Sequence, residues 1–190
     1  MLLIVDFFVL PQLLLIISLM AISPLNPPMQ KINLTQVPEV EHKSPKGKFH
    51  SFYQGVSLAL GRDDSSRDLD KRHPFDLEYN RLPPGGTNYP FHFHSAQWEL
   101  YVVVSGRGLV RDDKGLTEVG PGDAFLFRPC EAHQLSNPGK EDFIYYVIAD
   151  NPLGECCYYP DSKKWAVACE TPGRKRIHDS AQVPYYEGEE

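Results

Sequence analysis

The chain has 190 residues, which suits one globular domain and is enough to bury a hydrophobic core. It carries 19 basic and 25 acidic side chains, a net charge of −6, and no basic stripe, so we expect no nucleic-acid partner. Its 17 prolines, 14 glycines, ten tyrosines and ten phenylalanines favour short strands joined by turns.

Residues 1–28 form an apolar N-terminal segment. Residues 1–23 approach the length of a bilayer span, although Asp6 and Pro11 interrupt a clean helix. No Lys or Arg precedes them, so a secretory signal peptide is the least favoured interpretation. Either Met29 begins the functional protein, or residues 1–23 contact the membrane as an anchor with lysines on the cytoplasmic side. Both interpretations predict a cytoplasmic location for the rest of the chain.

Residues 29–74 are expected to form an N-terminal arm and a connector. The polar stretch 29–48 predicts an extended arm. Residues 48–61 are ambiguous between a strand and a helical turn. The charged stretch 61–74 has no periodicity and predicts a solvated loop.

Strand signals begin at residue 75 and recur at short intervals as far as residue 150. They lie at residues 75–82, 89–94, 98–104, 109–119 (a hairpin), 124–128, 133–137 and 142–150. Almost no helical periodicity separates them, so we predict an antiparallel all-β sandwich or barrel. Residues 151–190 predict one or two weaker strands and an acidic tail.

The four cysteines, Cys130, Cys156, Cys157 and Cys169, show no CxxC spacing. We therefore expect free thiols in a reducing compartment. Cys156 and Cys157 are adjacent, so their side chains should point to opposite faces of a strand and not pair with each other.

Two histidines and a glutamate lie around one predicted bend, in residues 90–108. Residues i and i+2 of a strand share a face, so His92 and His94 can converge on one point. Glu99 begins the following strand. His133 follows a predicted strand and turn that can return it to the same place.

This spacing resembles the cupin superfamily. Its first motif is matched by Gly86, His92, His94, Glu99 and Gly106, and the spacing of its second by Gly122, His133 and Asn137. Arg128 and Cys130 stand where the second motif has proline and glycine. The resemblance implies a double-stranded β-helix, or jelly-roll barrel, with its core at 75–150, an extended N-terminal arm before it and C-terminal strands after it.

The resemblance also implies one divalent metal ion, held by His92, His94, Glu99 and His133. Three imidazoles and a carboxylate suit Fe, Mn, Zn, Ni or Cu, and they leave coordination positions open if the metal is octahedral. A small-molecule ligand or oxygen would bind there.

Four further residues are candidates for lining the cavity. Tyr101 and Val103 share the face of Glu99, with core packing as an equal alternative for both. Gln97 flanks the bend. Arg128 can reach the cavity mouth and bind a carboxylate or phosphate, although a surface salt bridge is the favoured interpretation.

If His92 and His94 point inward, Phe91 and Phe93 point out of the barrel and need cover from the N-terminal arm or a second subunit. We expect a homodimer, as the resemblance also implies. The function expected is a metalloenzyme acting on a small molecule, dioxygenase-like or sugar-isomerase-like, with no catalytic residue assignable. The alternative is a non-catalytic ligand-binding or sensing module with a structural metal.

Overall fold

The computed structural model describes residues 29–63, 65–66, 68–168 and 174–188. The interpretations of the apolar segment 1–28 fall outside these residues. Within the described part of the chain, no helix has both the length and the apolar character needed to cross a membrane. The chain divides into two units, 1–31 and 32–190, and the second contains the fold described below.

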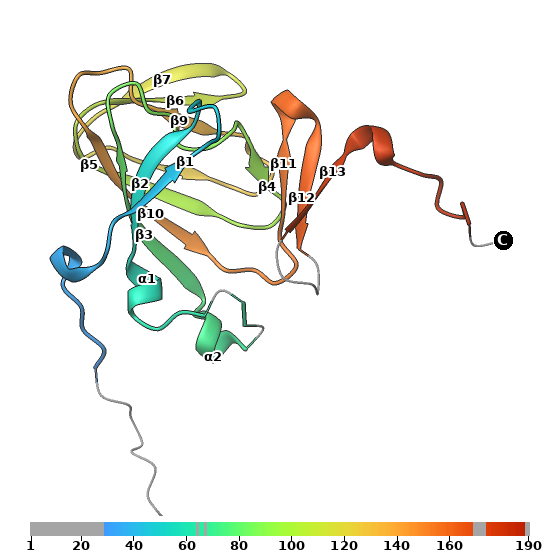
Figure 1. The fold of residues 1–190 in the computed structure, drawn as a ribbon, viewed down its shortest axis with the longest axis horizontal. Coiled ribbons are helices and arrows are strands. Elements are labelled where there is room, and N and C mark those ends of the chain that lie inside the picture. Colours follow the sequence, from blue (N-terminus) through green and yellow to red (C-terminus); the bar gives the residue numbers. More distant parts are fainter. Residues whose placement is uncertain (1–28, 64, 67, 169–173, 189–190) are drawn as a thin grey trace, which may run out of the picture. The chain divides into compact units, whose positions relative to one another are not determined.

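The described residues of unit 32–190 form three antiparallel sheets (Figure 1). The largest has six strands, in the order β1 (Val40–Lys43), β2 (His50–Gly55), β3 (Phe75–Leu82), β10 (Phe143–Asp150), β5 (Glu99–Ser105) and β8 (Ala124–Phe127). A second contains β13 (Arg174–His178), β12 (Lys164–Ala168), β11 (Cys156–Tyr159) and β4 (Phe93–His94). The third contains β7 (Gly115–Val119), β6 (Gly108–Asp112) and β9 (Gln134–Ser136). The antiparallel all-β fold expected from the sequence is confirmed.

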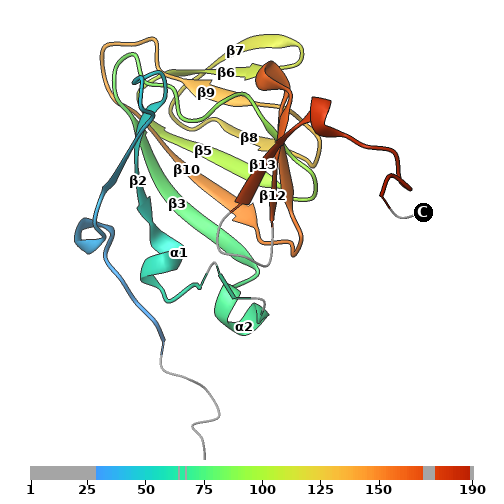
Figure 2. The same cartoon turned by 45° about the vertical axis from the view of Figure 1, so that its right-hand side comes forward.

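Among the described residues, helical structure is confined to short segments. Helices α1 (Val56–Ala59) and α2 (Leu69–Arg72) lie between β2 and β3, and both are visible at the lower end of the barrel in Figure 2. Single 3₁₀ turns occupy Leu34–Gln36, Pro160–Ser162 and Asp179–Ala181. The ambiguous stretch 48–61 thus forms β2 followed by α1, and the connector expected as a plain loop contains α2.

The inward faces of the central strands change from apolar to polar along their length. On β3, Leu82 packs in the core, whereas Asp76 and Glu78 line a cavity. On β5, Val103 packs in the core, whereas Glu99 lines the cavity. At the core end, Phe143 of β10 lies opposite Leu82 of β3, and Tyr145 of β10 lies opposite Val103 of β5. One end of the barrel is therefore a hydrophobic core, and the other end is free to hold polar side chains.

The hydrophobic core joins the six-stranded sheet to the sheet of β6, β7 and β9. Its members are buried apolar side chains: Leu82, Tyr101, Val103, Val110, Val119, Leu135, Phe143 and Tyr145. They come from strands far apart in the sequence, so their packing fixes the two sheets against each other.

Phe91 and Phe93 are covered by the chain itself. Phe91 is only 5% exposed, and the Arg111 guanidinium lies 3.9 Å from its ring centroid. Phe93 packs against Tyr158 and Trp165 of β11 and β12. The expectation that the N-terminal arm or a second subunit covers these rings is therefore wrong, because Arg111 of β6 lies over Phe91 and the C-terminal strands β11 and β12 contact Phe93.

Gly106 is expected to tolerate no side chain. Its φ is +74°, and a methyl group there would overlap the carbonyl oxygen of Asp142. Gly85 has nearly the same φ, +75°, but open space around its Cβ position. Thermal or denaturant unfolding should show that Gly106→Ala costs about 1–3 kcal/mol more than Gly85→Ala, because only the former adds steric overlap. Equal costs would contradict this packing constraint.

Candidate metal centre

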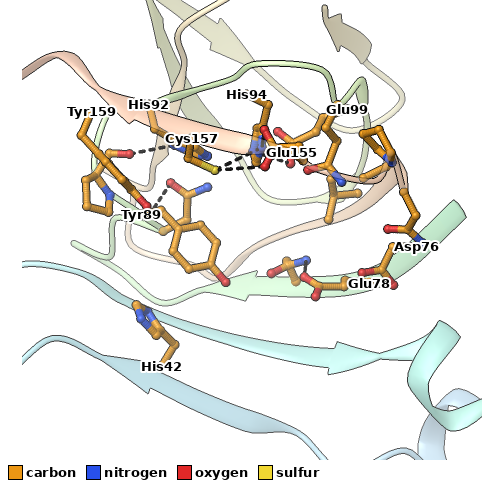
Figure 3. A pocket seen from close by; sticks show the side chains of 18 of the residues that line it. His42, Asp76, Glu78, Tyr89, His92, His94, Glu99, Glu155, Cys157 and Tyr159 are labelled. Carbon is orange, nitrogen blue, oxygen red and sulfur yellow. Dashed lines mark hydrogen bonds and ion pairs between the residues drawn. The ribbon is translucent and has the colours of Figure 1, made fainter. Parts of the chain in front are cut away.

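A cavity of about 1440 Å³ lies at the polar end of the barrel (Figure 3). Among the residues expected at the site from the sequence, His92, His94, Gln97, Glu99 and Tyr101 line it. His133 lies behind this lining and is 1% exposed. Val103 packs in the hydrophobic core, and Arg128 lies over the Trp98 ring, so neither lines the cavity.

Backbone pairing brings the histidines together. His92 and His133 form an isolated antiparallel bridge, in which each backbone N–H donates to the carbonyl oxygen of the other. His94 belongs to β4, where it pairs with Cys157 of β11. The His92 ring centroid is consequently 5.0 Å from that of His94 and 4.9 Å from that of His133.

The Glu99 carboxylate lies between two of these imidazoles. Its Oε2 is 2.7 Å from Nε2 of His133, and its Oε1 is 3.4 Å from Nε2 of His94. The Tyr101 hydroxyl also donates to Oε2, at 3.0 Å. Burial opposes ionisation of Glu99, but the hydrogen bonds from His133 and His94 outweigh it and hold the pKa of Glu99 well below its usual value.

The outer nitrogens of two histidines contact backbone carbonyls. Nδ1 of His92 is 2.8 Å from the Pro90 oxygen, and Nδ1 of His133 is 3.1 Å from the Glu131 oxygen. A carbonyl oxygen only accepts hydrogen bonds, so each Nδ1 is the donor and a neutral ring keeps its lone pair on Nε2. A carboxylate oxygen 2.7 Å from such an Nε2 requires a positive charge between them, either a proton or a metal ion.

The charge states of His92 and Glu99 also suit metal binding. Burial, together with the charge of His133, lowers the pKa of His92 to about 4. At neutral pH, His92 is therefore neutral while Glu99 is ionised, and these are the forms in which the two side chains bind metal ions.

A second group of potential ligands surrounds the other side of His94. Its Nδ1 is 3.2 Å from Oε1 of Glu155 and 3.3 Å from Sγ of Cys157 (Figure 3). Burial lowers the pKa of His94, but hydrogen bonds with Cys157, Glu155 and Glu99 outweigh burial and raise it to about 12. Among the described residues, potential ligand atoms lie within 4.8 Å of one another in two clusters. One consists of His92, Glu99 and His133, and the other of His94, Glu155 and Cys157. His94 links them.

Sequence reasoning missed Glu155 and Cys157. Both are buried, at 5% and 2% exposed, and they lie about 60 residues beyond His94 in the chain. Their proximity to His94 depends on the pairing of β11 with β4, which no local residue spacing in the sequence predicts. The expectation that Cys156 and Cys157 face opposite ways does hold, because only Cys157 lines the cavity.

Two carboxylates of β3, Asp76 and Glu78, were also not expected at the site from the sequence. They line the cavity across from Glu99 and Glu155 (Figure 3). Burial, with the nearby charge of Asp76, raises the pKa of Glu78 to about 7. A signal was present, since acidic residues at i and i+2 of a predicted strand share one face.

Comparison with known sequences identifies the domain. Residues 79–149 match the family model for the cupin domain. An oxalate-binding protein from Thermotoga maritima is 26% identical over 68 residues, which are 36% of this chain and 55% of that protein. An uncharacterized protein from Methanocaldococcus jannaschii is 29% identical over 79 residues, 42% of this chain and 56% of that protein. The chain thus matches about half the length of these curated relatives.

Solved structures share the fold at low sequence identity. A candidate sugar phosphate isomerase from Acidithiobacillus ferrooxidans aligns with a TM-score of 0.67 and 17% identity, covering 79% of this chain and 90% of that one. A cupin-superfamily sugar phosphate isomerase from Silicibacter pomeroyi aligns with a TM-score of 0.66 and 20% identity, covering 83% of this chain and 98% of that one. A predicted oxalate decarboxylase from Thermotoga maritima aligns with a TM-score of 0.53 and 16% identity, covering 64% of this chain and 99% of that one.

These structures carry different names for their activities, so the likeness concerns the fold alone. The fold agrees with the strand order and the motif spacing, and the jelly-roll barrel expected from the sequence is confirmed. Residues 79–149 therefore match a cupin domain, and the barrel that contains them has the fold of cupin-type proteins.

Proposed function

We propose that His92, His94, Glu99 and His133 bind one divalent metal ion and that a small polar molecule binds beside it in the cavity. The observation that carries the proposal is the position of the Glu99 carboxylate, which is 12% exposed and faces Nε2 of two imidazoles. A divalent cation at this point would supply the positive charge that the arrangement requires. The donor set accommodates Fe, Mn, Zn, Ni or Cu.

We further propose that the protein is an enzyme of the sugar-isomerase-like kind. A divalent ion in this centre would polarise an oxygen of the bound molecule. Glu78 lines the same cavity, and its pKa of about 7 suits a group that both accepts and returns a proton. Isomerisation of a hydroxy-carbonyl compound needs such a group to remove a proton from one carbon and deliver it to the next. Glu78 therefore favours isomerisation over the dioxygenase-like alternative.

Neighbouring side chains would support these roles. The Asn80 amide donates to Oε2 of Glu78 at 3.4 Å, which orients the carboxyl group. The Tyr101 hydroxyl holds Glu99. The similarity to solved sugar phosphate isomerases, although it shows only the fold, agrees with this assignment.

A non-catalytic binding module is the second candidate. It is favoured by the likeness to a Thermotoga maritima protein named for binding oxalate. Turnover of a sugar phosphate would support the enzyme, whereas saturable binding without turnover would support the binding module. The homodimer and the cytoplasmic location expected from the sequence remain predictions.

Removing a proposed ligand should weaken metal binding. We expect Glu99→Gln and His133→Ala each to reduce Co²⁺ affinity at least a hundredfold, on the order of 3 kcal/mol, since each removes a direct ligand. Isothermal titration calorimetry and the cobalt absorption spectrum would measure this. His178→Ala, an exposed histidine outside the cavity, is the matched control. Unchanged affinity in both ligand variants would refute the centre.

Glu155 should position His94 rather than bind the metal. Its carboxylate contacts Nδ1, so a hydrogen bond there would direct Nε2 toward the ion. Loss of such a partner weakens metal binding by about 10- to 100-fold, and we expect this of Glu155→Gln. The stoichiometry should stay at one ion per chain. A larger loss, equal to that of Glu99→Gln, would instead make Glu155 a direct ligand.

Glu78 should make stability fall as pH rises. Its pKa is raised from 4.5 to about 7 in the folded protein, so the folded state holds a proton that the unfolded chain releases. Between pH 5 and 8, the free energy of unfolding of Glu78→Gln should improve relative to the parent by up to about 3 kcal/mol. Denaturant unfolding with a chelator present would measure it. A pH-independent difference would show that Glu78 titrates normally.

Glu78→Gln should also abolish any sugar phosphate isomerisation while leaving Co²⁺ affinity within about threefold of the parent, because it removes the proton carrier and no metal ligand. Coupled assays of ketose formation would test this. Retained turnover would exclude Glu78 as the base.

A further inference from the structure

Two arginines from outside the recognised motifs enter the same cavity. Arg62 and Arg72 lie in the stretch between α1 and β3, and both line the cavity that holds the candidate metal centre. The backbone N–H of Asp63 donates to the Lys71 carbonyl at 2.8 Å. This bond brings the two ends of the stretch together and so places Arg62 near Arg72.

The barrel anchors this stretch at both ends. The Arg62 N–H donates to the Ser57 carbonyl at 2.9 Å, and Ser57 in turn accepts a hydrogen bond from the N–H of Leu77 on β3, at 2.7 Å. The Asn151 amide donates to the His73 carbonyl at 3.1 Å. Neither arginine is therefore carried on a free-standing loop, and both have fixed backbone positions at the cavity.

The Arg62 side chain is largely enclosed, and part of its hydrogen-bonding capacity is unused. Its side chain is 9% exposed and forms an ion pair with Asp76, which is 15% exposed, through one terminal nitrogen and Oδ2. Nε of Arg62 and Oδ1 of Asp76 are enclosed without a hydrogen-bond partner. An arginine–carboxylate pair commonly closes with two parallel hydrogen bonds, and this pair does not. Buried donors and acceptors without partners are rare in proteins, so the pair is incomplete as it stands.

The cavity is more basic than the chain as a whole. Its charged lining comprises five basic side chains, Lys43, Arg62, Arg72, Lys164 and Arg176, and four acidic ones, Asp76, Glu78, Glu99 and Glu155. The whole chain has 19 basic and 25 acidic residues. Clefts with an excess of one charge concentrate ligands of the opposite charge, so this cavity favours an anion.

We propose that Arg62 and Arg72 form an oxyanion subsite, which binds the phosphate ester or carboxylate of a small ligand whose hydroxyl-bearing end reaches the metal centre. The approach of the hydroxyl-bearing end to the metal centre rests on the proposed function, whereas the oxyanion subsite does not. Guanidinium groups present planar donors that match phosphate and carboxylate oxygens. One cavity of about 1440 Å³ contains both groups of residues, so a single molecule can contact both. An oxyanion would accept from the unused Arg62 donor after a small side-chain adjustment.

Calorimetry on the full chain tests the subsite, with fructose 6-phosphate and fructose as probes. The experiment uses both Co²⁺-loaded and chelated protein. The parent should bind the phosphate ester at least tenfold more tightly than the neutral sugar, and Arg62→Met and Arg72→Gln should each reduce this ratio to about threefold or less. Arg107→Met is the matched control, because Arg107 is exposed, pairs with Glu118 and does not line the cavity.

Further variants and probes keep the outcomes distinct. If Arg62→Met fails to fold, Arg62→Met/Asp76→Leu removes both partners of the ion pair and is measured instead. If the parent binds glucuronate more tightly than glucose and Arg62→Met removes this difference, the result would support the subsite with a carboxylate ligand. No preference for either anion, or a preference that survives both arginine substitutions, would overturn it. A preference that depends on Arg62 in protein that binds no Co²⁺ would uphold the subsite and refute the metal centre.

Discussion

The whole arrangement depends on a change of polarity along the inner face of one sheet. Strands β3 and β5 each carry apolar inward residues at one end and acidic ones at the other, whereas the inward face of β10 between them is apolar or aromatic throughout. Leu82 lies opposite Phe143, for example, while Asp76 lies opposite Ala149. Apolar packing at the first end holds the sheets together, so the second end need not be filled. The charged residues of the cavity are thus supported by a core that they do not interrupt.

Glu99 illustrates how a buried charge can persist in such a barrel. A carboxylate removed from water is costly unless opposite charge and hydrogen-bond donors surround it. Two imidazoles and the Tyr101 hydroxyl provide these contacts from β4, β5 and the stretch before β9.

The sequence predicts those parts of the molecule that have a local pattern. Alternation gives the strands, and the spacing of His92, His94, Glu99 and His133 indicates that they gather. Pairings between distant segments have no such pattern, so Glu155 and Arg62 could not be placed, and the cover over Phe93 was assigned to the wrong source. Glu78 is intermediate, because alternation in residues 75–82 puts it on the face of Asn80 but does not reveal what that face encloses.

The two-residue strand β4 has a consequence for how the protein matures. Within the part of the chain that the structure describes, β4 pairs as a strand only with β11, so the segment after residue 150 helps to hold His94, together with the Cys130 N–H that donates to the His94 carbonyl. During synthesis, the strands up to β10 emerge from the ribosome before β11 and β12 do. Capture of the proposed metal ion by all four ligands would therefore follow docking of the C-terminal hairpin of β11 and β12, which would make loading a late event in biogenesis.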